Sequence, residues 1–208
     1  MKQKIDLETW NRNEHFAFFN QMEEPFFGIT TNIDCSIAYK KCKILGFSFF
    51  TYYLHKTLLA VNAIENFKYR IINDKVYIFD QIDASATIMR EDKTFGFSCM
   101  EFNLDFDVFS KTTTKEIDRV RNSVGLFTRE FPSINLIHFS TIPWINFTAL
   151  SHARSFNFAD SCPKITFGKM IDFDNKKTMA MSVHVHHGLI DGYHLGKFVD
   201  LFQKLMDE

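Results

Sequence analysis

Strand-like and helix-like hydrophobic patterns are interleaved along this chain of 208 residues, but they do not alternate strictly. Alternating or β-branched runs predict strands over 26–34, 75–80, 82–89, 94–101, 135–141 and 164–172. Apolar residues at helical spacing predict helices over 7–20, 46–62 and 106–124, and a stripe from Leu195 to Met206 predicts a final helix. A doubly wound fold would need repeated βαβ units, so we expect an α+β fold built as a mixed β-sheet sandwich.

Turn residues predict how neighbouring strands connect. The run Asp174-Asn175-Lys176-Lys177 predicts a hairpin spanning 164–187. Polar pairs at 73–74 and 91–92 predict that the three strands between 75 and 101 form a β-meander. The sequence shows no internal repeat and no linker, so we expect a single domain over residues 1–208.

Charge and hydropathy argue against two classes of partner. The formal net charge is -1 and the lysines and arginines are scattered, whereas nucleic-acid binding needs concentrated positive charge. No stretch reaches the ~18 apolar residues that a membrane helix needs. The N-terminus has no signal-peptide apolar region. We therefore expect neither a nucleic-acid nor a membrane partner.

Cysteine and phenylalanine usage adds two expectations. Cys35, Cys42, Cys99 and Cys162 form no CxxC pair, and with no signal peptide we expect reduced thiols in a cytoplasmic protein. Phenylalanine occurs 25 times. Most of these rings must form core, but such a chain can also line an aromatic pocket for a flat or apolar ligand.

The run from His184 to Gly192, HVHHGLIDG, holds three histidines and an aspartate. The histidines can be ordinary strand residues before a turn. Alternatively, His184 and His186 share a strand face and could bind a metal ion with a third, distant ligand. In the third interpretation His187 is a general base, with Asp191 pairing with a distant cation or orienting the ring.

Further motifs give the run its context. HHGLIDG resembles the HHxxxDG signature of chloramphenicol acetyltransferases, which dihydrolipoyl acyltransferases and condensation domains share more loosely. In the same order as in that family, the chain carries WNRNEHF from Trp10, Thr94-Phe95 with Ser98, STIPW from Ser140, and TFGK from Thr166. The similarity runs from about residue 5 to residue 206.

This resemblance implies an acetyl-CoA-dependent O-acetyltransferase with the CoA-dependent acyltransferase fold, in which helices pack on one side of the sheet. It also implies a homotrimer with active sites between subunits and no metal. His187 would take the proton from the acceptor hydroxyl, which then attacks the thioester directly. By the same resemblance Ser140 would bind the oxyanion, and Thr166 would hold a water beside the transition state.

The resemblance also assigns supporting roles. Asp191 would form a buried ion pair with Arg12 that fixes the catalytic loop. Trp144, Lys169 and Ser140 would lie beside the coenzyme. The acceptor, a small hydroxylated molecule, would bind among residues that match the family's pocket: Phe18, Phe19, Phe27, Phe95, Phe127, His138 and His184.

The pocket departs from the family more than the catalytic residues do. His184 stands where the family has Gln, His138 where it has Asn, and His152 where Leu is usual. Phe19 replaces a Tyr and Phe97 a small residue. We therefore expect the acceptor to be either chloramphenicol or a different, related hydroxylated molecule. Two alternatives stay open at this point: a non-catalytic ligand-binding or sensor protein with the same fold, and a metal-dependent hydrolase that uses His184 and His186.

Overall fold

A six-stranded mixed sheet forms the centre of the protein, seen in a computed structural model that describes residues 1–130, 134–154 and 160–208. The strand order is β2-β9-β8-β7-β5-β6. Strand β7 pairs in parallel with β5 and β8, and the other neighbours are antiparallel. The bounds are Phe26–Asp34 (β2), Asp83–Met89 (β5), Phe95–Phe97 (β6), Leu136–Thr141 (β7), Lys164–Phe173 (β8) and Lys176–His186 (β9).

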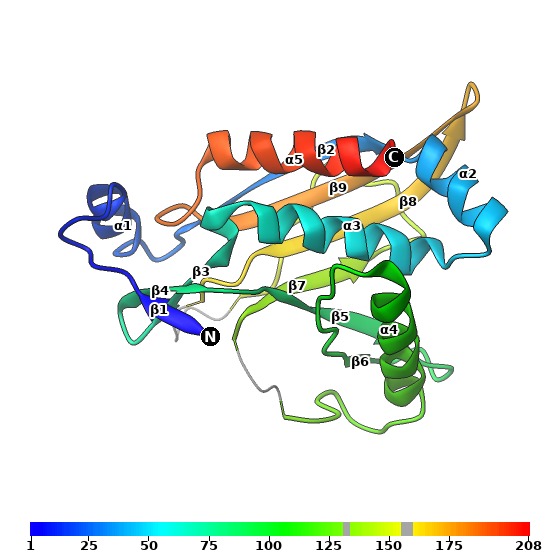
Figure 1. Cartoon of the computed structure of the whole chain (residues 1–208), viewed down its shortest axis with the longest axis horizontal. Helices are drawn as coiled ribbons and strands as arrows, with labels where there is room; N and C mark the ends of the chain where they lie inside the picture. The colour runs from blue at the N-terminus through cyan, green and yellow to red at the C-terminus, as the bar shows by residue number, and fades with distance from the viewer. Residues whose placement is uncertain (131–133, 155–159) are drawn as a thin grey trace.

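Helices cover one face of this sheet (Figure 1). They are α3 (Phe49–Ala63), α4 (Phe106–Arg121) and α5 (Gly192–Met206), while α1 (Asn13–Phe19) and α2 (Ser36–Leu45) lie toward its ends. Side chains from the three covering helices, such as Leu58, Phe109 and Phe198, join the buried core with side chains of the sheet. The expected α+β fold with helices on one side is confirmed.

The predicted β-meander is wrong in its pairing. Strand β4 (Lys75–Phe79) belongs to a separate three-stranded sheet with β1 (Lys2–Lys4) and β3 (Tyr69–Ile72), which follows the short helix η1 (Glu65–Lys68). Strands β5 and β6 do form an antiparallel pair, but β5 continues the main sheet through β7. The chain passes from the three-stranded sheet to the main sheet between Phe79 and Asp83. There β5 pairs with β7, a strand about 50 residues further along the chain, and not with its sequence neighbour β4.

Two helix predictions also need correction. The predicted helix over 46–62 begins at Phe49, because Gly46 adopts a left-handed φ of 71° that ends α2, and Ser48 caps α3 by accepting the backbone N–H of Thr51. Helix α2 was not predicted, since it is rich in lysine and buries only Ala38 and Cys42. The predicted helix over 7–20 is limited to α1, and the residues before it form turns.

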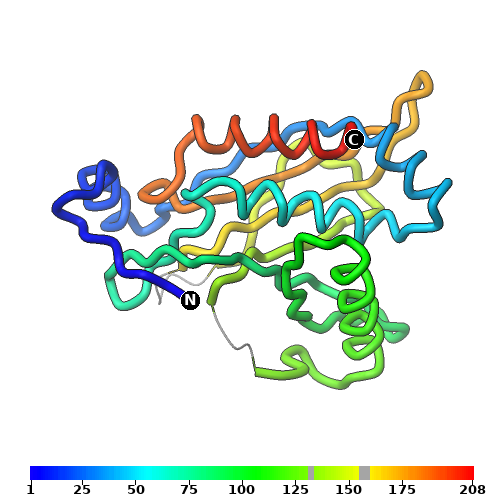
Figure 2. The backbone as a smooth tube through the Cα atoms, in the orientation of Figure 1, coloured from blue at the N-terminus to red at the C-terminus, as the bar shows by residue number. Residues whose placement is uncertain are grey.

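The predicted hairpin over 164–187 is confirmed as β8 and β9. Asp174 and Asn175 have φ values of 50° and 61°, the left-handed pair that a type I′ turn requires. The turn projects from the body of the molecule (Figure 2). The long strands leading to it pair over most of their length, with one irregularity between Phe167 and Met170, and this pairing sets the register of the residues that end β9.

Alternation along β9 separates an apolar face from a polar face. Met181, Val183 and Val185 enter the core beneath the helices. Ser182, His184 and His186 therefore point to the opposite face, because successive side chains of a strand alternate. This polar face of the sheet carries four predicted site residues, His138, Ser140, Thr166 and His184.

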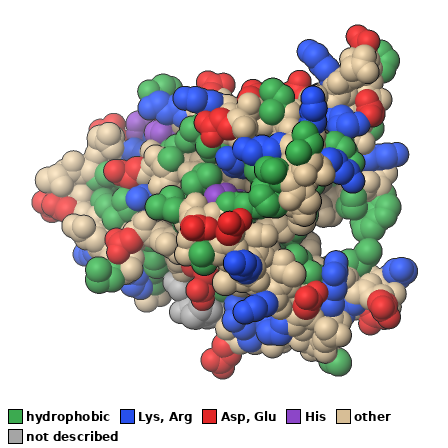
Figure 3. All heavy atoms as spheres, turned by 45° about the vertical axis from the view of Figure 1, so that its right-hand side comes forward, with side chains coloured by type: hydrophobic (Ala, Val, Ile, Leu, Met, Phe, Trp, Pro, Cys, Tyr) green, Lys and Arg blue, Asp and Glu red, His purple; other side chains and the backbone are tan. Residues whose placement is uncertain are grey.

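Figure 3 shows acidic and basic side chains interspersed over the visible face. Within the described ranges, no helix combines the length and apolar character needed to cross a bilayer. All four cysteines lie in the described part of the chain and are free thiols.

Candidate active site

His187 follows the last residue of β9 and is held between two aromatic rings. Its imidazole stacks on Phe19 with a centroid distance of 3.9 Å and an angle of 9°, and it lies 4.4 Å from the ring of Phe27. Its backbone N–H donates to the carbonyl of Pro25 at 2.8 Å. Its buried Nδ1 has no hydrogen-bond partner among the described residues, so packing sets the ring orientation here.

Arg12 ties the loop after His187 to the start of α5. Its Nη1 donates to Asp191 Oδ2 at 2.7 Å, its Nη2 to the His187 carbonyl at 3.1 Å, and its Nε to the Gly188 carbonyl at 3.4 Å. Arg12 is 6% exposed. The expected Arg12–Asp191 contact is therefore present, and the same guanidinium holds the backbone of His187 directly.

Asp191 also begins α5. It is the N-cap residue, and its Oδ1 accepts the backbone N–H of Tyr193 at 3.1 Å. In turn, Nδ1 of His194 accepts a hydrogen bond from the backbone N–H of Asp191, which completes a capping box. Burial alone would raise the pKa of Asp191, but the hydrogen bond from Arg12 and the nearby His194 outweigh it and lower that pKa below its ordinary value.

We expect Asp191→Ala to lower the free energy of unfolding by about 3 kcal/mol, the low end for a broken buried pair because 29% of the Asp191 side chain is exposed. Activity falls with it, because the His187 loop loses its anchor. Asp191→Asn keeps a capping oxygen and loses less stability. Thermal melts and turnover of both variants check this, and an unchanged melting temperature in Asp191→Ala contradicts it.

The lowered pKa of Asp191 also has a consequence for acid stability. A carboxyl whose pKa is lower in the folded state stabilises the fold fully above its unfolded pKa of about 3.9. That contribution is lost as the pH falls through the lower, folded pKa. We expect Asp191→Asn to flatten this acid limb of stability against pH, which denaturant titrations between pH 6 and pH 3 measure; a limb of unchanged slope contradicts it.

His186 is structural in this arrangement. It is 2% exposed, and its Nδ1 accepts the backbone N–H of Gly188 at 3.1 Å. Burial lowers its pKa to about 4, which keeps it neutral and able to accept. A Cβ on Gly188 would lie 3.1 Å from the His186 ring, so the glycine allows this close turn. The sequence alone gave no role for His186, because the contact depends on a turn that periodicity does not show.

The described residues contain no group of three or more His, Cys, Asp or Glu side chains placed to hold a metal ion. His184 and His186 do share a sheet face, as the metal interpretation required. However, His186 already uses Nδ1 within its own turn.

Two hydroxyls meet on the polar face of the sheet. Ser140 on β7 and Thr166 on β8 are cross-strand partners, and their oxygens lie 2.6 Å apart. Thr166 is fully buried and Ser140 half-buried. Ser182 on β9 continues the same row. A buried partner hydroxyl fixes the Ser140 rotamer and leaves its other hydrogen-bonding direction for a ligand.

The next row of the same face carries His138, Lys164 and His184, which are opposite one another on β7, β8 and β9. The His184 ring lies over Gly28, where a Cβ would approach it to 2.5 Å. His152 packs edge-on against His184 with centroids 4.9 Å apart. Burial, and secondarily nearby charges that include Lys164, lower the pKa of His152 to about 4, and burial also lowers the pKa of His184. The protein packed around His138 and the nearby Lys164 lower its pKa to about 4 as well, although the residue is exposed at the surface of the single chain. This row therefore presents neutral imidazoles near pH 7.

Lys164 was missed from sequence. Its Nζ contacts Asp160 Oδ2 at 2.5 Å and lies 4.8 Å from the ring centroid of Phe26. Its position two residues before Thr166 was the available signal, because period-two spacing places both on one face.

The predicted coenzyme residues lie together beyond the hydroxyl pair. Trp144 is 65% exposed, and the next residue, Ile145, accepts the backbone N–H of Lys169 at 2.8 Å. Trp144 follows the end of β7, and Lys169 lies within β8, three residues beyond Thr166 in the same direction along these parallel strands. Trp144 and Lys169 are therefore on one side of Ser140 and Thr166, and His138 is on the other.

One chain does not assemble the whole predicted site. Thr166 is opposite Ser182, and His187 lies five residues further along the chain, just past the end of β9, roughly 16 Å away at an extended rise per residue. Phe18 and Phe19 pack together near β2 and β9, with Phe27 on β2 itself. Phe95 and Phe127 lie with Phe97 at β6, the opposite edge of the sheet, roughly 24 Å away at usual strand spacing. Phe18, Phe95 and Phe127 are all exposed.

Comparisons with known proteins agree in covering nearly the whole chain. The chloramphenicol acetyltransferase family matches residues 2–203. The chain is 31% identical over 206 residues to a chloramphenicol acetyltransferase of Staphylococcus aureus, covering 98% of this chain and 95% of that protein. It is 27% identical over 204 residues to chloramphenicol acetyltransferase 3 of Escherichia coli, covering 97% and 95% respectively.

Solved structures show the same relationship. A chloramphenicol acetyltransferase superposes with a TM-score of 0.87 at 30% identity, covering 99% of this chain and 100% of that one. A truncated catalytic core of the 2-oxoacid dehydrogenase complex from Thermoplasma acidophilum gives a TM-score of 0.68 at 13% identity over 99% of both chains, which shows a shared fold alone. With its HHGLIDG run, its paired Ser140 and Thr166, and these matches, the chain belongs to the chloramphenicol acetyltransferase family.

Proposed function

We propose that this protein is a cytoplasmic homotrimer that transfers acetyl from acetyl-CoA to a hydroxyl of chloramphenicol or a related small acceptor, and so confers resistance to the antibiotic. The observation that carries the proposal is the separation of His187 from the Ser140–Thr166 pair within one chain. A neighbouring copy that brings its hydroxyl pair to His187 would complete the site. The exposed rings of Phe18, Phe95 and Phe127 fit an acceptor pocket shared between copies.

In this reaction His187 accepts the proton of the acceptor hydroxyl as its oxygen attacks the thioester carbonyl. Ser140 donates a hydrogen bond to the carbonyl oxygen as negative charge develops there, and Thr166 holds Ser140 in position and orients a nearby water. The protonated imidazole then returns its proton to the departing sulfur. Trp144 and Lys169 would flank the coenzyme on the far side of the hydroxyl pair.

A thiol-release assay tests the proposal. Purified protein is incubated with acetyl-CoA and a panel of hydroxylated acceptors that includes chloramphenicol. We expect acceptor-dependent release of CoA. Binding of acceptors without any turnover would indicate a ligand-binding or sensor protein instead.

The row of neutral imidazoles affects which acceptors the site binds well. His138 and His184 occupy the polar positions beside the hydroxyl pair, on the side away from the coenzyme residues. They present ring nitrogens where the family has the amides of Asn and Gln. An acceptor that binds the family through one of these amides would therefore make about one hydrogen bond fewer in this protein.

We expect the double variant His138→Asn/His184→Gln to lower KM for chloramphenicol by roughly fivefold, the effect of one recovered hydrogen bond. The KM for acetyl-CoA should not change. Steady-state kinetics with each substrate varied in turn provide the measurement. An unchanged or higher KM for chloramphenicol would show that the imidazoles do not discriminate against it.

A further inference from the structure

The segment 124–129 follows α4 and carries Phe127, yet it has little apolar packing of its own. Val124 is 96% exposed, Leu126 44% and Phe127 68%. Its backbone meets β6 where the Phe97 N–H donates to the Leu126 carbonyl at 3.0 Å. Polar contacts among the described residues also hold this segment in place.

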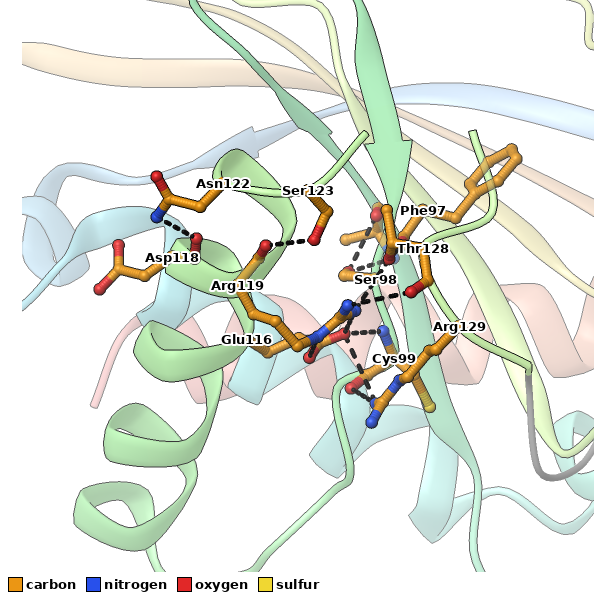
Figure 4. A network of polar contacts seen from close by, with 11 residues as sticks. Phe97, Ser98, Cys99, Glu116, Asp118, Arg119, Asn122, Ser123, Thr128 and Arg129 are labelled. Atoms are coloured by element: carbon orange, nitrogen blue, oxygen red, sulfur yellow. Dashed lines mark hydrogen bonds and ion pairs between the residues drawn. The ribbon is translucent and has the colours of Figure 1, made fainter. Parts of the chain in front are cut away.

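A buried carboxylate lies behind it (Figure 4). Glu116 on α4 is 8% exposed and accepts the backbone N–H of Cys99 at 2.7 Å. Arg119 donates to both of its oxygens, at 2.7 and 2.9 Å, and Arg129 lies 3.5 Å away. Burial alone would raise the pKa of Glu116, but these hydrogen bonds and charges lower it, so the group stays ionised.

Arg119 and Arg129 connect the Glu116 carboxylate to segment 124–129. Arg119 Nη2 donates to Thr128 Oγ1 at 2.9 Å, and Thr128 Oγ1 donates to the Phe97 carbonyl at 3.3 Å. Arg129 donates to the Cys99 carbonyl at 2.9 Å. The network therefore fastens the segment to Phe97 of β6 and to Cys99, two residues beyond that strand's last residue.

The position of segment 124–129 determines how the rings of Phe127 and Phe97 pack against each other. Phe97 and Phe127 have centroids 5.3 Å apart, and Phe95 packs on Phe97 at 5.6 Å. Phe127 and the next three residues line a shallow, open depression on the surface. Small movements of segment 124–129 would change the shape of this aromatic wall.

We propose that Glu116, Arg119 and Thr128 are positioning residues that fix Phe127 against Phe97 and so set the affinity for the acceptor. This inference rests on the proposed function, in which these rings bind the acceptor. It assigns these three residues no contact with acetyl-CoA and no part in proton transfer. The network therefore acts on KM for the acceptor alone.

Thr128→Val and Thr128→Ser form the matched test, because valine keeps the size of threonine and serine keeps the hydroxyl. We expect Thr128→Val to raise KM for chloramphenicol about fivefold, the effect of one lost hydrogen bond, with kcat and KM for acetyl-CoA unchanged. Thr128→Ser should stay near wild type. Glu116→Gln should raise KM for chloramphenicol more, while Asp118→Asn, an exposed carboxyl on the same helix, should not.

Amide hydrogen exchange of Phe97 provides a readout independent of activity. We expect faster exchange in Thr128→Val than in wild type or Thr128→Ser. Unchanged exchange, or a lower melting temperature with unchanged KM, would overturn the inference. If wild type releases no CoA with chloramphenicol, the proposed function fails for that acceptor, and the exchange data still decide whether the network holds the segment.

Discussion

Replacing His187 with glutamine should lower kcat with chloramphenicol by about 10²–10⁴-fold, the range for removal of a general base. Glutamine fills much of the space between Phe19 and Phe27 but cannot accept the proton near neutral pH. The expected loss is therefore in chemistry and not in folding. Thiol release at saturating acetyl-CoA and acceptor measures it.

The control for this prediction is His15→Gln on α1, an exposed histidine. It should retain wild-type turnover. Both variants should melt within a few degrees of wild type, because neither removes an ion pair. Turnover by His187→Gln equal to that of the control would exclude His187 as the base.

Local pattern predicted much of the fold. The helical stripes of α3, α4 and α5 and the turn of the β8–β9 hairpin are encoded in neighbouring residues. The pairing of β5 with β7 is not encoded locally, since these strands are separated by about 50 residues. The backbone of a strand can form hydrogen bonds with any adjacent strand, so local pattern does not identify the partner. For this reason the sequence assigned β4 to the wrong sheet.

In the candidate site, too, contacts between residues far apart in the sequence could not be predicted from local pattern. Resemblance to a family, and not spacing, paired Arg12 with Asp191 across 179 residues. Glu116 and Arg119 look like an ordinary solvated pair on a helix, and only the fold shows that Glu116 is buried against Cys99 and that Arg119 reaches Thr128. Polar side chains that depend on tertiary contacts carry no periodic signal.

The site between copies makes a prediction of large effect. Ser140→Ala should lose roughly 10²-fold or more in rate, because it removes an oxyanion donor, and His187→Gln loses its base. If the two residues act from different chains, mixed trimers should recover activity that neither parent has. In a cyclic trimer made from both variants, one of the three interfaces pairs an intact His187 with an intact Ser140.

Co-expression with two different tags and sequential purification isolates the mixed trimers. We expect them to show about a third of wild-type kcat, at least ten times that of either parent, because a symmetric ring restores one site in three. The reason is the separation of roughly 16 Å along the chain between His187 and Ser182, the residue opposite Thr166, since a general base must reach its proton at about 3 Å. Mixed assemblies no more active than their parents would place the whole site within one chain and contradict the proposed arrangement.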